Sequence, residues 1–382
     1  MKTVRRLRAG TSAVRVAVVL GLVAGICVVG PSADAAGADG ELDAVVCTTP
    51  KSCLAIGWHF PSLLARRWNG TSWTAVPITP PASEHKQYVS DIACVSVSRC
   101  FGVGFDVGSS TSALLEGWNG TRWTRLTAPE PAGFTGGMLT GVSCPKANFC
   151  VASGVYDRSD AQRAYVARWN GTAWSITKVP RPGNTFEMTA DSISCRNASD
   201  CYTVGDIVAS TTRTLVMHWN GAGWARVPSP TPPHMVFLTD VSCTTGNFCF
   251  AVGSYRQNGS YAPFGLRWTG STFTLLTTAV PSGTENDGFV SVSCTSPSSC
   301  FTVGATNQNN GNGHPWVKRW DGTRWKSVAS PAVGNVSGLF DVSCPSPKMC
   351  MAVGLSVSQG GFYKAVAMRW NGTKWSLASP TS

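Results

Sequence analysis

Short apolar runs alternate with polar, turn-rich segments from about residue 41 to the end of the chain. Residues 338–382 show the pattern once: "GLFDVSC" alternates apolar and polar positions, "MCMAVGLSV" is an apolar run, and "KAVAMRW" and "KWSLASP" follow on either side of "NGT". Alternation with a period of two, bounded by Gly, Pro, Asn and Ser, is typical of β-strands. The unit therefore predicts a four-stranded antiparallel meander of about 50 residues.

An Asn-Gly turn between two tryptophans marks the end of each unit. The copies are "RRWNGTSW" (66–73), "EGWNGTRW" (116–123), "ARWNGTAW" (167–174), "MHWNGAGW" (217–224), "LRWTGSTF" (266–273), "KRWDGTRW" (318–325) and "MRWNGTKW" (368–375). Asn-Gly between two strands predicts a type I′ turn, in which both central residues have positive φ. We expect the tryptophans to pack a core between neighbouring sheets, and ligand binding is the alternative interpretation.

Fourteen of the 15 cysteines form seven C-x5-C pairs, and each second cysteine is followed four residues later by a glycine. The pairs are Cys47/Cys53, Cys94/Cys100, Cys144/Cys150, Cys195/Cys201, Cys243/Cys249, Cys294/Cys300 and Cys344/Cys350. Five scattered histidines do not complete zinc sites, and no C-x-x-C redox motif is present, so we expect disulfides. Each would close the hairpin between the first two strands of a unit, where Cα atoms lie about 4.5–5.5 Å apart.

Seven contiguous units of one kind predict a single domain over residues 36–382. A meander of this length cannot bury a core alone, and a radial stack of seven forms an all-β, seven-bladed β-propeller with one disulfide per blade. We expect the ring to close by packing the first blade on the seventh, without exchange of a strand. The predicted blades are residues 41–80, 88–130, 138–181, 189–231, 237–281, 288–331 and 338–382.

The order of features within a unit resembles the kelch-type blade of galactose-oxidase-like propellers. "VSCTTGNFCFAVG" (241–253) matches its first two strands and "LRWTGSTF" (266–273) its last two, and the resemblance covers residues 41–382. A single glycine stands where the kelch blade has a pair, and the cysteines are not a kelch feature. "WDGTRW" (320–325) is similar to the Asp-box turn of sialidase-like propellers. The resemblance implies a propeller fold but places no catalytic residue, cofactor or metal on this chain.

Residues 1–35 predict a secretory signal peptide, because five basic residues precede an apolar run and an Ala-Asp-Ala cleavage site. Cys27 follows a bulky Ile26, which argues against lipidation. No later stretch reaches the roughly 20 apolar residues of a membrane span, so we expect a secreted, extracellular protein. Without this segment 26 basic and 19 acidic residues remain, a net charge of +7. Because the basic residues form no block, nucleic acid is not an expected partner.

The turns at the cysteines and at Asn-Gly should share one face of the ring, and the longer loops the other, where binding sites usually lie. Aromatic side chains beside Asn, Gln and Arg would offer a sugar ring a stacking surface and hydrogen bonds; the alternative is that they only cover loop backbone. The candidate ligand-binding residues on that face are Trp58, His59, Tyr156, Tyr255, Tyr261, His314, Trp316 and Tyr363.

Acidic and histidine side chains of the same loops are the candidates for catalysis. Paired carboxylates would serve a glycosidase, and Tyr or His with Arg a polysaccharide lyase. The candidates are Glu84, Asp157, Asp160, Glu187, Glu285, Asp287, His59, His85, His234 and His314. Asp91, Asp240 and Asp341 stand three residues before a first cysteine. They would either ring the mouth of the central channel or, the interpretation we favour, cap loop amides where the strands begin.

These observations favour a monomeric, secreted binding module for cell-wall or extracellular carbohydrate that uses the long-loop face. A hydrolase or lyase acting on polysaccharide is the second hypothesis. A platform for a cell-surface protein partner is the third.

Overall fold

A computed structural model of the chain describes residues 40–59, 62–79, 86–158, 161–183, 185–244, 247–257, 259–279, 284–308, 313–334, 336–358 and 361–379. The predicted signal peptide, with Cys27, lies outside these ranges. Within them, no helix is long and apolar enough to cross a membrane.

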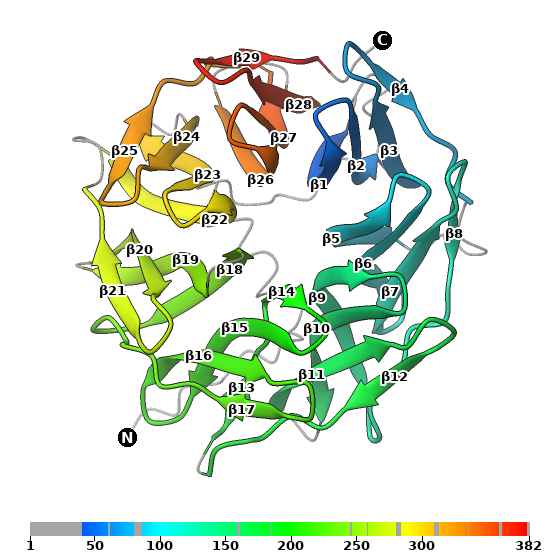
Figure 1. Cartoon of the computed structure of the whole chain (residues 1–382), viewed down its shortest axis with the longest axis vertical. Coiled ribbons are helices and arrows are strands. Elements are labelled where there is room, and N and C mark those ends of the chain that lie inside the picture. Colours follow the sequence, from blue (N-terminus) through cyan, green and yellow to red (C-terminus); the bar gives the residue numbers. More distant parts are fainter. Residues whose placement is uncertain are drawn as a thin grey trace, which may run out of the picture.

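The described residues form an all-β ring of seven four-stranded antiparallel blades around a central axis, which confirms the predicted seven-bladed β-propeller (Figure 1). The innermost strands are β1 (Glu41–Thr49), β5 (Lys86–Ser96), β9 (Gly136–Lys146), β13 (Glu187–Met188) with β14 (Ser192–Asn197), β18 (Val236–Thr244), β22 (Thr284–Ser296) and β26 (Val336–Ser346). The second strands are β2 (Ser52–His59), β6 (Arg99–Val107), β10 (Phe149–Arg158), β15 (Asp200–Val208), β19 (Phe248–Gln257), β23 (Ser299–Gln308) and β27 (Met349–Val357).

The two outer strands of each blade are set by the tryptophan pair, since the third strand ends at the first aromatic residue and the fourth begins at the second. The third strands are β3 (Ser62–Trp68), β7 (Thr111–Trp118), β11 (Ala161–Trp169), β16 (Thr212–Trp219), β20 (Ser260–Trp268), β24 (Gly313–Trp320) and β28 (Tyr363–Trp370). The outermost are β4 (Trp73–Ala75), β8 (Trp123–Arg125), β12 (Trp174–Thr177), β17 (Trp224–Arg226), β21 (Phe273–Thr277), β25 (Trp325–Val328) and β29 (Trp375–Leu377).

The turn between these outer strands differs from the predicted type I′ turn. Only its glycine has a positive φ, for example 107° at Gly70, whereas Asn69 does not. The Asn69 side chain instead accepts hydrogen bonds from the amides of Thr71 and Ser72 and from the Thr71 hydroxyl, each 2.9 Å long. Asn or Asp at this position therefore acts through its side-chain oxygen, and the intervening loop has four residues because Trp68 pairs with Trp73.

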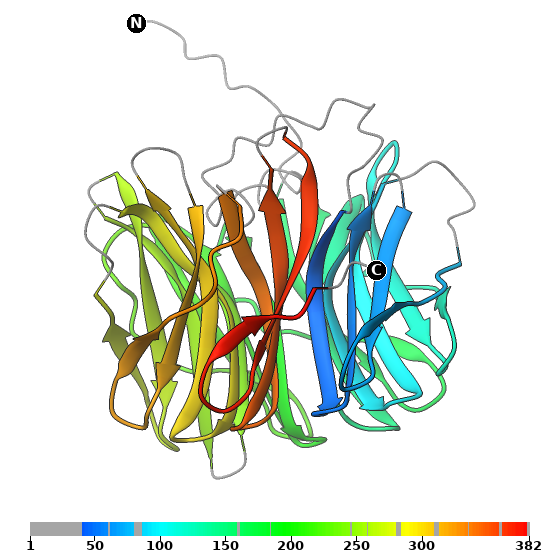
Figure 2. The same ribbon diagram turned by 90° about the horizontal axis from the view of Figure 1, so that it is seen from above.

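All seven predicted disulfides are present, and each links the first and second strand of one blade. The paired Cα atoms lie 3.9 to 4.1 Å apart, closer than expected. In most blades the cysteines are direct cross-strand partners, with a register shift immediately before the turn. The cysteine turns and the Asn-Gly turns lie on the same face of the ring, along the lower edge in Figure 2.

The second cysteine of each pair is buried, although the pairs flank turns at one face of the ring. These cysteines belong to the hydrophobic clusters between blades, because the second strand of each blade is buried on both sides. At most 1% of their surface is exposed at Cys53, Cys100, Cys150, Cys201, Cys249, Cys300 and Cys350. The disulfides therefore have a structural role, because these buried cysteines are not accessible in the way that site residues are. The sequence predicted the pairing but not this burial.

The hydrophobic core lies between the blades, as predicted for the tryptophans. Trp118 and Trp123 of the second blade are buried against Leu54, Ile56 and Ala65 of the first. The same arrangement closes the ring, because Trp68 and Trp73 of the first blade pack on Met349 and Met351 of the seventh. The indole Nε1 of Trp73 also donates to the carbonyl of Ala378 at 3.1 Å. One parallel pair, Gly313 with Val336, joins the sixth and seventh blades, but no described strand of the first blade pairs with the seventh, so closure there rests on packing and side-chain hydrogen bonds.

A β-bulge in the innermost strands explains the glycine that follows each second cysteine. In six blades the register shifts around the residue four positions before the first cysteine, for example between Val89 and Asp91. The bulge presses the inner strand onto its neighbour, and a Cβ at Gly104 would lie 2.0 Å from the carbonyl oxygen of Tyr88. Corresponding glycines such as Gly354 meet the same obstruction, so only glycine fits.

Candidate functional site

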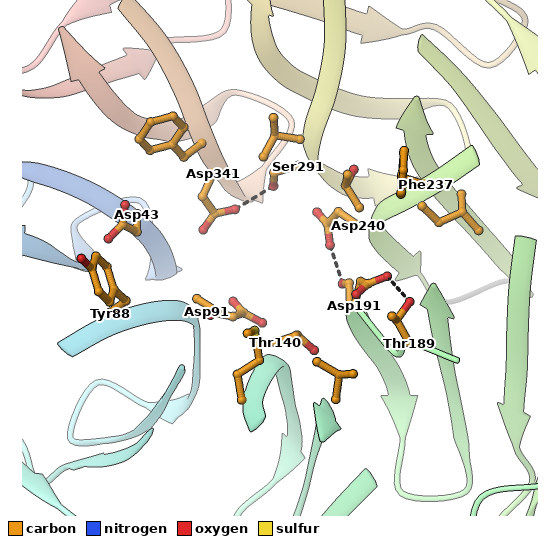
Figure 3. Close-up of a pocket in the computed structure, with 18 of the residues that line it drawn as sticks. Asp43, Tyr88, Asp91, Thr140, Thr189, Asp191, Phe237, Asp240, Ser291 and Asp341 are labelled. Carbon is orange, nitrogen blue, oxygen red and sulfur yellow. Dashed lines mark hydrogen bonds between the residues drawn. The ribbon is translucent and has the colours of Figure 1, made fainter. Parts of the chain in front are cut away.

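A cavity of about 220 Å³ occupies the central channel (Figure 3). Its lining includes residues at or near the start of the innermost strands, which is the end nearer the long loops. One water needs roughly 10–15 Å³ of such a volume, so the cavity has room for a small ligand or the end of a longer one. It is lined by residues of all seven blades, and none of the disulfide cysteines is among them. The site is thus a product of ring closure and belongs to no single blade.

The bulge decides which side chains reach the cavity. Because the bulged residue is left unpaired in the ladder, the strand turns side chains from adjacent positions toward the axis. The position four residues before the first cysteine contributes one lining residue from every blade: Asp43, Ser90, Thr140, Asp191, Thr239, Val290 and Phe340. The next position adds Asp91, Ser192, Asp240, Ser291 and Asp341.

Asp91, Asp240 and Asp341 both line the channel and join neighbouring blades. The Oδ2 atom of each accepts a 2.7 Å hydrogen bond from an inner-strand amide of the next blade, donated by Val142, Val292 and Val45 respectively. Ser192 and Ser291 donate from the preceding blade to Asp240 and Asp341 at 2.6 and 2.7 Å. The three side chains therefore line the channel, which was the alternative interpretation, and they also cap amides as the favoured one expected, but these amides belong to strands and not to loops.

A second belt of hydrogen bonds runs below this ring, one residue before the first cysteines. There the serine hydroxyl of one blade accepts from the cysteine amide of the next, at 2.9 to 3.0 Å. The pairs are Ser143 with Cys195, Ser194 with Cys243, Ser242 with Cys294, Ser293 with Cys344 and Ser343 with Cys47. The two belts hold the cavity walls in place, which favours a preformed site.

The cavity is acidic, and burial dominates the titration of its carboxyl groups. Burial raises the pKa of Asp341 to about 7 against the opposing effect of its hydrogen bonds. Burial, followed by the negative charge of Asp341, raises the pKa of Asp91 well above its usual value. The pKa of Asp240 is also raised by burial. Among the described lining residues, none is Lys, Arg or His.

Glu41 and Asp43 form a second acidic group on β1. Burial raises the pKa of Glu41 to about 7, and burial together with the charge of Glu41 raises the pKa of Asp43 well above normal. Tyr88 lies beside Asp43 at the cavity edge (Figure 3). Its ring stacks on Phe105 at 4.8 Å and on Trp58 at 5.8 Å between centroids. The wall here combines carboxylates with an aromatic face held from behind.

Gln162 on β11 also lines the cavity and is only 1% exposed. Within the described part of the chain, neither its Oε1 nor its Nε2 atom has a hydrogen-bond partner. A buried amide without partners costs free energy of folding. A ligand in the cavity could supply both a donor and an acceptor to it.

The candidate ligand-binding residues from the sequence fall into two groups. Trp58, Tyr255 and Trp316 are at most 9% exposed, so their rings are not free to stack on a sugar. Trp316 is covered by Phe289 at 4.9 Å, and Tyr255 packs in the core beside Phe264. The physical reason is that each follows the strand pattern into the space between two sheets.

The other five candidates keep partial or full exposure. His59 is exposed, and Tyr156, Tyr261, His314 and Tyr363 are half-buried. Tyr261 packs on the cavity residue Phe237 at 6.2 Å, and burial followed by the charge of Glu41 raises the pKa of Tyr363. Tyr261 and Tyr363 are thus near the cavity, whereas Tyr156 packs on Phe134 at 6.3 Å.

The candidate acids and histidines of the loops are not brought together into one site. Glu84, Asp160 and His85 lie outside the described residues, as do the side chains of Glu285 and Asp287. His234 is exposed, and Asp157 and Glu187 are half-buried. None of the described ones lines the cavity. In the described part of the chain, no group of three or more His, Cys, Asp or Glu is arranged to hold a metal ion.

Sequence reasoning missed Glu41, Asp43, Asp191, Asp206 and Gln162, which all line the cavity. Aligning the units on their first cysteines would have brought Asp43 and Asp191 into one column, one residue before Asp91. The bulge that turns both columns toward the axis was not predicted. Gln162 gives no sequence signal, because its position in the cavity wall depends on the tertiary structure.

Comparison with known proteins identifies the fold. No protein-family model and no curated protein sequence matches the chain. The BP39L lectin from Burkholderia pseudomallei is similar in structure, with a TM-score of 0.60 and 15% identity over 90% of this chain and 99% of the lectin. The GH74 xyloglucanase from Xanthomonas campestris has a TM-score of 0.59 and 12% identity over 90% of this chain. The match covers 55% of the xyloglucanase, so this chain spans about half its length.

YCF48 from Cyanidioschyzon merolae is a further structural match, with a TM-score of 0.53, 12% identity, and coverage of 83% of this chain and 94% of YCF48. At these identities the comparisons speak for the architecture alone. Together with the seven blades described above, they establish that the chain is a β-propeller.

Proposed function

We propose that the protein is an extracellular carbohydrate-binding propeller whose ligand enters the central cavity from the long-loop face. The observation that carries the proposal is the composition of the cavity wall. Tyr88 and Phe237 offer half-buried aromatic faces, and carboxylates, hydroxyls and the Gln162 amide stand around them. Sugar rings bind through such a combination, because their C–H faces pack on aromatic rings while their hydroxyls need acceptors and donors.

Two further findings support the proposal. The same fold is used by a lectin, with 99% of that chain covered. The seven disulfides agree with an oxidising compartment outside the cell. Secretion, the signal peptide and the kelch type of the blades stay predictions from the sequence.

The test is affinity electrophoresis through gels that contain different polysaccharides, followed by titration calorimetry with oligosaccharides of any that retard the protein. Tyr88→Ala and Phe237→Ala should abolish retardation, since each removes a stacking face. Phe186→Ala is the matched control, because Phe186 is 70% exposed and is not among the cavity-lining residues. No retardation by any polysaccharide, or equal loss with Phe186→Ala, would contradict the proposal.

Glycoside hydrolysis is the second candidate function, on the basis of Glu41 and Asp43. The two carboxyls interact, and burial raises the pKa of Glu41 to about 7, as a general acid requires. Incubation with a retarding polysaccharide should then release reducing ends, and Glu41→Gln should stop the release. Binding without any product would leave the protein a lectin.

A further inference from the structure

We propose that the cavity selects a sugar bearing a protonated amine, with the ammonium held by Asp43 and Glu41 beside the ring of Tyr88. The inference rests on the carbohydrate-binding function proposed above and names the ligand class. It follows from the charge of the cavity, from which of its carboxylates are already engaged, and from an unpaired amide among its walls.

The cavity gathers acidic side chains within a basic protein. Seven carboxyl groups line it, those of Glu41, Asp43, Asp91, Asp191, Asp206, Asp240 and Asp341, and no cationic side chain does so among the described residues. The whole chain nevertheless has a net charge of +11. Burial and mutual repulsion raise the pKa values of these carboxyls, so an ammonium that enters the cavity favours their charged form, whereas an anionic sugar would add to the repulsion.

Most of these carboxylates already accept hydrogen bonds from the protein. Asp91, Asp240 and Asp341 bind inner-strand amides of the next blade. Asp191 accepts the hydroxyl of Thr189 at 2.7 Å. The pair on β1 is different, because neither the Glu41 nor the Asp43 carboxyl accepts a hydrogen bond within the described part of the chain, although both line the cavity. An ammonium beside them would also relieve the repulsion by which Glu41 raises the pKa of Asp43. They are therefore the carboxylates we assign to the ligand.

The ring of Tyr88 completes the ammonium site. Burial raises the pKa of Tyr88, and the negative charges of Glu41 and Asp43 raise it further. Stacking contacts with Trp58 and Phe105 hold the ring in position. An ammonium close to an aromatic face is stabilised by the ring quadrupole, more so where water is displaced. Aromatic walls also favour an organic cation over a bare metal ion.

Gln162 provides the independent sign that a polar ligand belongs here. Both polar atoms of its side chain lack partners in the described part of the chain, although the residue is 1% exposed and lines the cavity. A sugar hydroxyl both donates and accepts, so it satisfies an amide that an alkylamine leaves unpaired. Glu41 and Asp43 would bind an ammonium group and Gln162 a hydroxyl group, and an amino sugar carries both.

Titration calorimetry at neutral pH tests the inference with three matched oligosaccharides, of glucosamine, N-acetylglucosamine and glucose, and with a simple alkyl diamine and calcium ion as further probes. The variants are Asp43→Asn, Glu41→Gln and Gln162→Leu. Glu130→Gln is the control, because it removes one negative charge at an exposed position that is not among the cavity residues. Melting curves establish that each variant folds.

The glucosamine oligomer should bind at least about tenfold more tightly than the other two oligosaccharides, since a charge-assisted hydrogen bond has that effect. Asp43→Asn and Glu41→Gln should each weaken it about tenfold or more, with no change in Glu130→Gln. Gln162→Leu should reduce the preference for the amino sugar over the diamine.

Equal binding of all three oligosaccharides would overturn the amine inference and leave carbohydrate binding intact. Tighter binding of the diamine than of the glucosamine oligomer would show an amine site and overturn the carbohydrate proposal. Binding of calcium in preference to every amine, or of none of the probes, would overturn the inference.

Discussion

Asp341 links the last blade to the first, the one junction of the ring that no continuous chain spans. Its Oδ2 atom accepts from the amide of Val45 on β1, and its Oδ1 atom accepts from the hydroxyl of Ser291, each at 2.7 Å. In Asp341→Ala both donors lose their acceptor, and so does the amide of Val342, which also donates to Oδ1 at 2.7 Å. Since each buried donor left unpaired costs about 1–3 kcal/mol, and the variant no longer buries a carboxyl, we expect a net loss of about 2–4 kcal/mol.

For a chain of this length the loss corresponds to a decrease in melting temperature of about 3–6 °C, measured by differential scanning calorimetry. Asp240→Ala is the matched control, because Asp240 makes equivalent bonds to Val292 and Ser192 where the chain itself joins the blades. Both variants should melt earlier. Only Asp341→Ala should also accelerate hydrogen exchange in β1 and β26, since opening there requires no stretching of a connecting segment.

The reasoning would be refuted by a melting temperature within about 1 °C of the wild type for Asp341→Ala. Equal acceleration of exchange in the two variants would refute the part of the argument that concerns ring closure. A selective effect on β1 and β26 would identify this junction as the weakest of the ring.

Three further predictions concern stability. Burial raises the pKa of Glu116 to about 7, so between its unfolded pKa and pH 7 the folded state binds more protons than the unfolded state. The free energy of unfolding should therefore fall by up to about 3 kcal/mol as the pH rises through this range. In melting curves recorded at several pH values, Glu116→Gln should reduce this dependence of stability on pH. Replacing Cys294 and Cys300 by Ser should cost about 2 kcal/mol in chemical denaturation, because that disulfide closes a short loop, and an unchanged midpoint would contradict this. Asn371→Ala removes the acceptor of three turn hydrogen bonds, including the 2.8 Å bond from the Thr373 hydroxyl. The free energy of unfolding should fall by about 1 kcal/mol in the same assay. An unchanged value would mean that the glycine alone determines the turn.

Local signals in the sequence were sufficient for the blade. The alternation of residues 338–344, the cysteine pairs and the tryptophans around each Asn-Gly are all repeated at a fixed spacing, and each acts over a few residues. Strands, disulfides and the inter-blade packing of Trp118 and Trp123 could be predicted for that reason. The turn type was wrong, because Asn69 uses its side-chain oxygen and has no positive φ.

The sequence by itself determined the repeating unit, the number of units and therefore the ring. Only the tertiary structure decided where a ligand would bind. Asp43, Asp91 and Asp341 become neighbours of one cavity because closure brings together strands up to about 300 residues apart, and the Val45 amide meets Asp341 across a separation of 296 residues. Trp58 and Trp316, which have the appearance of loop aromatics in the sequence, are instead buried between sheets. Periodicity reports which face of a strand is buried, but which residues share a cavity depends on a bulge and on blades that are distant in the chain.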